Sequence, residues 1–382
     1  MKKLTFVISA AILLGACTGE KKNSTGFEIR GSLSNTLGET VYLEKLTSSS
    51  QTKIDSAVIN EKGEFVLNHV APSLGFYRIK VNEANFAMLV LDSAEKVVLK
   101  GDAKNLGNTY TTEGSPGTDL FKEYNKLAEA HRTRVDSMEN VFRTFLVTMR
   151  MDSLRADSLS KQMEKPYEAM IKAYSDVVAQ KIKANTGSFA SVMAVQQLNP
   201  EDYMDVYIAL DKGLSQKYPG NPDVVRFHSV VEQDQMMVNR TKAIAIGAEA
   251  PEINLPMPND KPLALSSLRG KVVLIDFWAS WCGPCRKEMP NVKRIYEKYK
   301  SKGFEIYGVS LDKEKEDWLA AISKDGLTWP QVSDLAYWQS KAAQDYAVQA
   351  IPFTVLIDKN GKILAKNLRG AELESKIAEI LH

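Results

Sequence analysis

The stretch VVLIDFWASWCGPCRKEMP, residues 272–290, constrains the fold of this chain more than any other. Its first seven residues are typical of a buried strand, and the residues from Cys282 to about Lys300 predict a helix. Further strands and helices alternate beyond it, and the turn at 359–361 predicts that the last two strands pair antiparallel. Residues 246–382 are therefore expected to form an α/β domain.

Cys282 and Cys285 are placed on one side of the first turn of this helix. At the N-terminus Cys282 faces unpaired backbone N–H groups and the positive end of the helix dipole, which favour the thiolate. Cys282 is therefore the expected attacking group, and Cys285 is expected to resolve the resulting mixed disulfide. Pro284 is tolerated between them because the first turn leaves its N–H position unpaired in any case.

A zinc site is the alternative use of such a cysteine pair, and it would need a second pair of ligands. The sequence contains no such pair, and its four histidines show no ligand spacing; they are His69, His131, His228 and His382. We therefore expect neither a metal nor another cofactor.

The first residues, MKKLTFVISAAILLGACTGE, combine a basic start, an apolar run and small residues, which predicts a signal peptide over 1–16. Within them, LGAC resembles the bacterial lipobox, so that Cys17 is the expected site of lipidation; conventional cleavage beside an incidental cysteine is the alternative. Residues 17–26 are expected to form a solvated tether. The predicted location is the cell envelope, as a membrane-anchored lipoprotein that faces the periplasm.

Lipidation of Cys17 would leave Cys282 and Cys285 as the only thiols, in a compartment where structural disulfides would be allowed. A disulfide that spans two intervening residues constrains little chain entropy, so redox turnover explains the pair better than stabilisation does. Loss of Lys2 and Lys3 with the signal peptide leaves 47 basic against 47 acidic residues. Such a balance lacks the basic footprint of a nucleic-acid-binding protein.

Two regions precede the α/β domain. Residues 27–112 alternate short apolar segments with turn residues, which predicts an antiparallel β-sandwich or curled sheet, with a hairpin-like break at 60–63. Residues 113–245 place apolar residues at spacings of three and four, which predicts at least two long helices and then shorter ones. The methionines of this helical region are expected to pack between helices.

With its flanks included, SSLRGKVVLIDFWASWCGPCRKEMP resembles the thioredoxin superfamily, and in particular its TlpA/ResA-like branch of extracytoplasmic thiol:disulfide oxidoreductases. The resemblance covers about residues 247–382 and implies a thioredoxin-like fold. It places the family's cis-proline on Pro352, so that Ile351 would offer its backbone to an extended substrate; a turn proline in the ordinary trans form is the alternative. Phe353 departs from the threonine often found next in the family.

The resemblance also points to two carboxylates. Asp276 matches the buried aspartate of thioredoxins, where burial would raise its pKa and allow proton exchange with Cys285 through water. A polar group satisfied by a hydrogen bond at a strand end is the alternative. Glu288 matches a carboxylate near the site of ResA-like proteins, and an exposed helix residue is the alternative there.

Five further residues around the cysteines have expected roles. Trp281, Gly283 and Pro284 are expected to contact the substrate, whereas packing is the favoured role of Trp278. Pro290 falls inside the helix, as it does in the family, and should kink it.

These features together predict a reductase of disulfides in envelope proteins, since thioredoxin is reducing at about −270 mV whereas the oxidant DsbA lies at about −120 mV. The resemblance implies service to cytochrome c maturation, with electrons from a transmembrane thiol carrier. The region ahead of the α/β domain resembles a domain of unknown function that often precedes TlpA-like domains. That likeness implies partner binding, dimerisation or spacing from the membrane.

Two other functions stay open at this point. A thiol peroxidase is one, although Ile275 and Ala279 stand where a peroxiredoxin would want proline and threonine or serine. The other is a binding scaffold whose thioredoxin-like domain docks clients without redox turnover.

Overall fold

The protein is described by a computed structural model over residues 26–36, 38–47, 50–69, 74–148 and 153–381. Its contacts divide the chain into two compact units, residues up to 198 with 208–227, and 199–207 with 228–382. Cys17 and the expected signal peptide lie outside the described residues.

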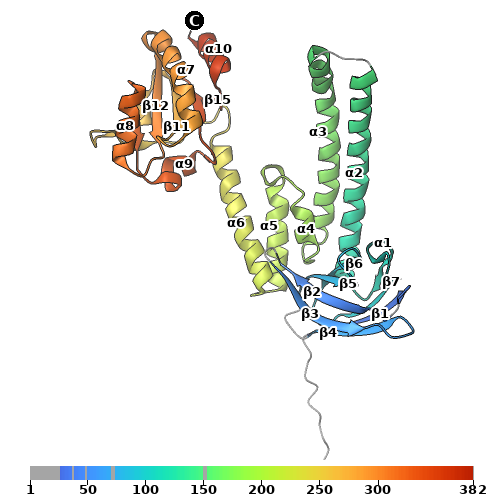
Figure 1. Ribbon diagram of the computed structural model, residues 1–382. Helices are drawn as coiled ribbons and strands as arrows, with labels where there is room; N and C mark the ends of the chain where they lie inside the picture. Colours follow the sequence, from blue (N-terminus) through green and yellow to red (C-terminus); the bar gives the residue numbers. More distant parts are fainter. Residues whose placement is uncertain (1–25, 37, 48–49, 70–73, 149–152, 382) are drawn as a thin grey trace, which may run out of the picture. The chain divides into compact units, whose positions relative to one another are not determined.

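The first unit begins with two four-stranded sheets, drawn in blue to blue-green in Figure 1. Their strand orders are β4-β1-β7-β8 and β3-β2-β5-β6. Alternate residues such as Ile29, Leu43 and Leu99 are fully buried in one shared core, as in a β-sandwich. The strands are β1 (Phe27–Ser34), β2 (Thr40–Leu46), β3 (Gln51–Val58), β4 (Glu64–His69), β5 (Gly75–Lys80), β6 (Phe86–Leu91), β7 (Lys96–Asp102) and β8 (Thr111–Glu113).

Two features of these sheets differ from the prediction. β1 and β7 pair parallel, so the domain is not purely antiparallel. The break at 60–63 joins β3 and β4, which belong to different sheets, and so it is not a hairpin. Asn60 closes this turn by accepting from the backbone N–H groups of Lys62 and Glu64, both at 2.9 Å. These local bonds form whichever sheet the next strand joins, and the turn residues therefore mark where a strand ends without indicating its partner.

The helical stretch contains the two long helices that the sequence predicts. α2 (Pro116–Thr148) and α3 (Ser153–Lys183) lie side by side as a hairpin (Figure 1), with the rings of His131 and Tyr174 stacked at 4.2 Å. The other helices of this stretch are α4 (Ser191–Val195), α5 (Pro200–Lys217) and α6 (Pro222–Ala243), while the short helix α1 (Leu106–Thr109) lies between β7 and β8 of the sandwich. None of the helices in the described ranges is both long and apolar enough to cross a membrane.

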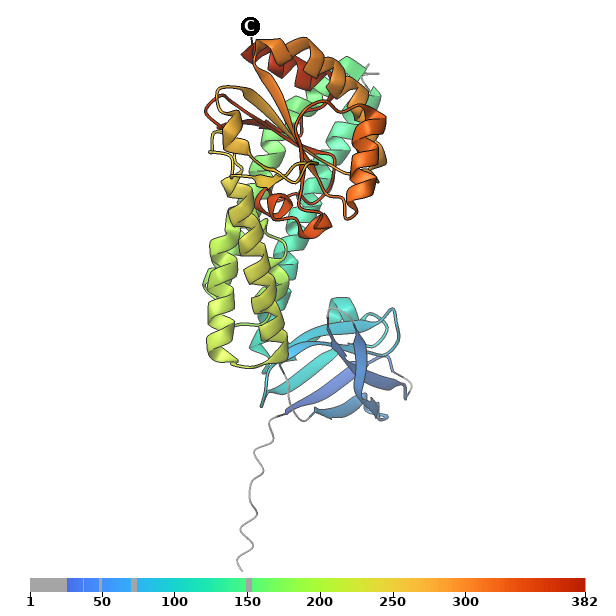
Figure 2. The same cartoon turned by 90° about the vertical axis from the view of Figure 1, so that its left-hand side faces the viewer.

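The second unit is built on a five-stranded sheet of order β13-β12-β11-β14-β15, seen from another side in Figure 2. All seven residues of the central strand β11 (Val272–Trp278) are buried, which explains why six of them are apolar and Asp276 is the one charged residue among them. β11 runs parallel to β12 (Phe304–Ser310) and antiparallel to β14 (Phe353–Ile357). The edges are β13 (Gln331–Ser333) and β15 (Ile363–Lys366). This is the expected thioredoxin-like arrangement.

Helix α7 (Gly283–Tyr299) follows the central strand and runs without interruption through Pro290. It packs beside α10 (Gly370–Ile380), whose Glu374 accepts hydrogen bonds at 2.7 Å from Arg294 and Lys298 of α7. β14 and β15 pair antiparallel, which confirms the prediction from the turn at 359–361. Smaller elements complete the unit: β9 (Asn254–Pro256), β10 (Pro262–Ala264), α8 (Lys315–Asp325), α9 (Lys341–Asp345) and the 3-10 turns η1 (Leu265–Leu268), η2 (Lys300–Lys302) and η3 (Tyr337–Gln339).

Candidate active site

The two cysteines lie where the central strand β11 is followed by helix α7. A disulfide joins Cys282 to Cys285, with their Cα atoms 5.3 Å apart. Cys282 caps the helix, and its Sγ accepts a hydrogen bond from the backbone N–H of Cys285 at 3.2 Å. A first-turn N–H that the helix leaves unpaired thus points at this sulfur, which favours a thiolate there once the pair is reduced.

The loop ahead of Cys282 is held by Asp312, which follows the neighbouring strand β12. The Asp312 carboxylate accepts from Ser280 Oγ at 2.6 Å and from Ser280 N at 3.0 and 3.1 Å. It also accepts from Ser310 Oγ at 2.7 Å, and its own residue is 1% exposed. A buried carboxylate with this many donors fixes the loop in one conformation.

Asp312 was not among the predicted site residues, although the sequence contains a signal for it. β11 and β12 are parallel neighbours, so the residues that follow their carboxyl ends meet at one edge of the sheet. A polar residue within two positions of the end of the second strand, as Asp312 is, can therefore anchor the loop that follows the first strand.

The Ile351–Pro352 peptide bond is cis, as the family resemblance implies. Pro352 and Cys285 line the same enclosed cavity. The Pro352 carbonyl accepts a hydrogen bond from the guanidinium of Arg369, which was also not among the predicted site residues. Phe353 opens β14 and packs its ring 6.0 Å from that of Phe277, so the departure from threonine places an aromatic ring against the core.

Asp276 is 4% exposed and lines this cavity together with Cys285 and Arg369. Burial raises the pKa of the Asp276 carboxyl to about 7, while the positive charge of Arg369 lowers it and the negative charge of Glu288 raises it further. The cavity measures about 10 Å³, close to the space that one water molecule needs. The arrangement therefore suits proton exchange between Asp276 and Cys285 through a single water.

Glu288 also lines the cavity, on helix α7. Its Oε1 accepts from Asn291 Nδ2 at 2.7 Å and from the backbone N–H of Gly370 at 3.0 Å. Glu288 is thus half-buried and ties α7 to the first residue of α10, rather than standing free on the helix surface.

The two tryptophans beside the site differ in exposure. Trp278 is fully buried and donates from Nε1 to Gln331 Oε1 at 2.9 Å, so it packs as expected. Trp281 is 47% exposed, directly before Cys282. Gly283 and Pro284 are exposed as well. Three of the four groups expected to meet a substrate thus lie on the surface around the disulfide, and their contact with a substrate stays a prediction.

Ile351, the fourth, is half-buried beside the cis bond and packs on the hydrophobic core of this unit. Its backbone role toward an extended substrate stays a prediction too.

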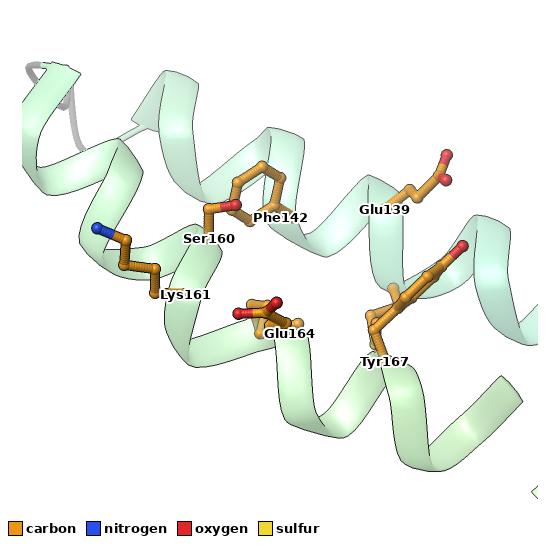
Figure 3. Close-up of a pocket in the computed structure, with 8 residues that line it drawn as sticks. Glu139, Phe142, Ser160, Lys161, Glu164 and Tyr167 are labelled. Carbon is orange, nitrogen blue, oxygen red and sulfur yellow. The ribbon is translucent and has the colours of Figure 1, made fainter. Parts of the chain in front are cut away.

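A different cavity, of about 390 Å³, opens between the long helices α2 and α3. Figure 3 shows Phe142 of α2 and Tyr167 of α3 in its wall. No cysteine lines it, and the charged groups there, such as Glu139 and Lys161, are exposed. Its larger size therefore does not make it the reactive site. Across the described ranges, no three histidine, cysteine or acidic side chains are arranged to hold a metal ion.

Comparison with known proteins agrees with this geometry. Residues 245–381 match the family model Redoxin, and residues 27–121 match that of a domain of unknown function, DUF4369. The thiol-disulfide oxidoreductase ResA of Geobacillus thermodenitrificans is 37% identical over 121 residues, which are 32% of this chain and 68% of that relative. ResA of Bacillus subtilis is 33% identical over 141 residues, 37% of this chain and 76% of the relative.

Among solved structures, the thioredoxin domain of a thiol-disulfide oxidoreductase from Bacteroides vulgatus is 38% identical. The match spans 36% of this chain and 99% of that chain, with a TM-score of 0.35.

Proposed function

Because the chain belongs to the ResA-like family of thiol-disulfide oxidoreductases, we propose that it reduces disulfides of envelope proteins from a membrane anchor at Cys17. One observation carries the proposed roles of the two thiols. Cys282 caps α7 beside the exposed Trp281, whereas Cys285 lines the enclosed cavity with Asp276. Cys282 is itself only 4% exposed, so its proposed role as the group that meets a client rests on its place next to the exposed indole, and Cys285, 2% exposed, is placed to exchange a proton inside.

In the first step the reduced protein attacks the client. The Cys282 thiolate, stabilised by the Cys285 N–H, forms a bond to one sulfur of the client disulfide. The other client sulfur leaves with the bonding electron pair and takes up a proton. A mixed disulfide between Cys282 and the client results, and Cys285 is still a thiol.

In the second step Cys285 releases the client. Its thiol gives its proton through water to Asp276, whose pKa of about 7 suits a proton acceptor near neutral pH. The Cys285 sulfur then bonds to Cys282, and the client sulfur leaves and is protonated. Two electrons have passed to the client, and the Cys282–Cys285 disulfide of the present structure is the product. A transmembrane thiol carrier is the proposed source of the electrons that reduce it again.

Trapping of clients tests this function. In Cys285→Ser the release step is lost, so the full chain expressed in its own envelope should accumulate mixed disulfides through Cys282. The matched control is the double variant Cys282→Ser/Cys285→Ser, which should trap nothing. Clients carrying CxxCH segments would support the proposed service to cytochrome c maturation. Equal yields from trap and control would count against redox turnover and favour a docking scaffold.

A peroxide assay distinguishes the proposed reductase from a thiol peroxidase. With excess dithiol, the wild-type protein should consume peroxide no faster than the dithiol does alone. Peroxide consumption that disappears in Cys282→Ser would instead identify a peroxidase.

The anchor is tested separately, because Cys17 lies outside the described residues. Its support is the signal-like start of the chain and the LGAC pattern. Wild-type protein should take up labelled fatty acid and sediment with membranes, and Cys17→Ser should do neither. A variant that still sediments would argue against lipid anchoring.

A further inference from the structure

An aromatic surface borders the attacking cysteine, made by Trp281, Tyr337 and Trp338. The Trp281 ring lies 5.3 Å from that of Tyr337 and 6.1 Å from that of Trp338, centroid to centroid, and the last two are 5.9 Å apart. Trp281 is 47% exposed, and the other two are partly exposed. Tyr337 and Trp338 come from η3, more than fifty residues after Trp281.

The backbone that brings Tyr337 and Trp338 to this place is unusual. Leu335 and Tyr337 have φ angles of +54° and +55°, in the left-handed region that residues other than glycine rarely adopt. Such conformations persist where the surroundings enforce them, and they gather at functional sites.

Hydrogen bonds hold this turn at both ends. The Leu335 N–H donates to Ser333 Oγ at 3.1 Å, and the carboxylate of Asp334 accepts from Ala336 N and Lys341 N, both at 3.2 Å. The two rings are thus set in a fixed position before any client arrives, which lowers the entropic cost of binding one.

The aromatic surface is continuous with the reactive sulfur. Trp281 directly precedes Cys282, so a segment that presents its disulfide to Cys282 must cover the exposed indole. Binding is favoured when an apolar side chain of that segment moves out of water and packs against the rings. A polar side chain in the same place contributes little binding free energy. Lys313 Nζ lies 4.6 Å from the centre of the Tyr337 ring, so this ring already makes a cation–π contact.

We propose that Trp281, Tyr337 and Trp338 select clients that carry an apolar or aromatic side chain next to the disulfide cysteine. The partner that fits is an extended, incompletely folded segment, because folding buries such side chains. This inference rests on the proposed reductase function and adds its substrate class. Tyr337 and Trp338 would then be specificity-determining residues that leave the chemistry of the cysteines unchanged.

Two probe peptides test the proposal. They are identical except for phenylalanine or serine directly before a cysteine that is disulfide-bonded to glutathione. The full-length protein is reduced with dithiol, freed of it, and mixed with each peptide in a single turnover. The peptide disulfide is reduced to peptide thiol and glutathione while Cys282 and Cys285 are oxidised, and quenched samples are read by mass spectrometry.

Wild-type protein should reduce the phenylalanine peptide about tenfold faster, the factor expected for one buried aromatic contact. Tyr337→Asn removes the ring but tolerates the left-handed backbone, and it should lose at least half of this preference on a logarithmic scale. Trp338→Leu should also lose at least half of the preference for the phenylalanine peptide. Tyr337→Phe keeps the ring and should keep the preference. The matched control Leu319→Asn alters an exposed apolar residue of α8 and should change nothing. All variants should reduce the serine peptide within twofold of wild type.

The possible failures differ from one another. Equal wild-type rates for the two peptides, or a preference unchanged in both Tyr337→Asn and Trp338→Leu, would overturn the inference and leave the reductase function intact. A wild-type protein that reduces neither peptide would overturn the reductase function itself, and the inference with it.

Discussion

The pKa of the Asp276 carboxyl group is set by effects that act in opposite directions. Apolar residues that line its cavity, such as Met289 of α7 and Leu373 of α10, bury it, which favours the neutral form, and the charge of Glu288 acts in the same direction. Arg369 opposes them from the loop before α10. The result is a pKa of about 7, where the group can both accept and return a proton in the physiological range.

Replacing this carboxyl should change how the release of clients depends on pH. In wild type the release rate should rise with pH through about 7, as Asp276 loses its proton and becomes a base. In Asp276→Asn release must wait for Cys285 to ionise unaided, near its ordinary pKa of about 8.5, so release at pH 7 should slow at least about tenfold. Stopped-flow decay of the mixed disulfide across pH 5.5 to about 9.5 would measure this.

Arg369 provides the matched control for that experiment. Arg369→Met removes the charge that lowers the pKa of Asp276, so the midpoint of the release profile should move to higher pH, whereas Arg369→Lys should keep it near wild type. A profile identical in Asp276→Asn and wild type would show that Asp276 takes no part in the proton transfer.

At the scale of elements, the site depends on how the ends of neighbouring strands meet. β11 delivers Asp276 and the loop to Cys282, β12 is followed by the Asp312 anchor, and the cis bond precedes β14. The anchor contributes to stability as well as to position, because Asp312 satisfies buried donors that would otherwise lose their partners.

Loss of the anchor should destabilise the domain around the site. In Asp312→Ala the N–H and hydroxyl of Ser280 and the hydroxyl of Ser310 lose their acceptor, which should lower the free energy of unfolding by about 3 kcal/mol. Urea unfolding followed by tryptophan fluorescence measures this, since all five tryptophans lie between residues 278 and 338.

The control is Glu379→Ala, which removes an exposed ion pair with Lys376 and should cost less than about 1 kcal/mol. A loss in Asp312→Ala no larger than in this control would contradict the anchoring role.

The sequence was sufficient for elements with a strong local signal. The apolar run of β11, the capped start of α7 and the Asn-Gly turn before β15 all depend on neighbouring residues, and the structure contains each of them. Features that depend on how strands are ordered in a sheet were either not predicted or predicted wrongly. The parallel pairing of β1 with β7 is one case.

The site residues divide in the same way. Asp276 and Cys285 were predicted, but Asp312 and Arg369 reach the site from 30 and 87 residues beyond Cys282. The left-handed turn at Tyr337 was missed because neither glycine nor asparagine marks it.

At the scale of the whole molecule, the reactive site belongs to a self-contained part of the chain. In the described residues, the buried core around the cysteines extends from Ile244 to Leu381, and the sandwich has a separate core from Phe27 to Leu106. Every group that the proposed chemistry uses, from Asp276 to Arg369, lies in the part of the chain that forms the core around the cysteines. The activity on small disulfides should therefore not require the preceding residues.

A chain that begins at Ile244 should accordingly fold alone and reduce the glutathione-linked probe peptides within about threefold of the full-length rate, since its core and site are complete. Its thermal unfolding should be a single transition, read from tryptophan fluorescence. With Cys285→Ser, however, it should trap fewer envelope clients than the full-length trap when both are localised by the same lipidated start, if residues 27–243 bind partners, which is one of the three roles implied for them. Equal trapping by the two chains would place client recognition entirely on the α/β domain, around Trp281 and its aromatic neighbours. Loss of peptide reduction by a folded fragment would instead show that the earlier residues complete the site.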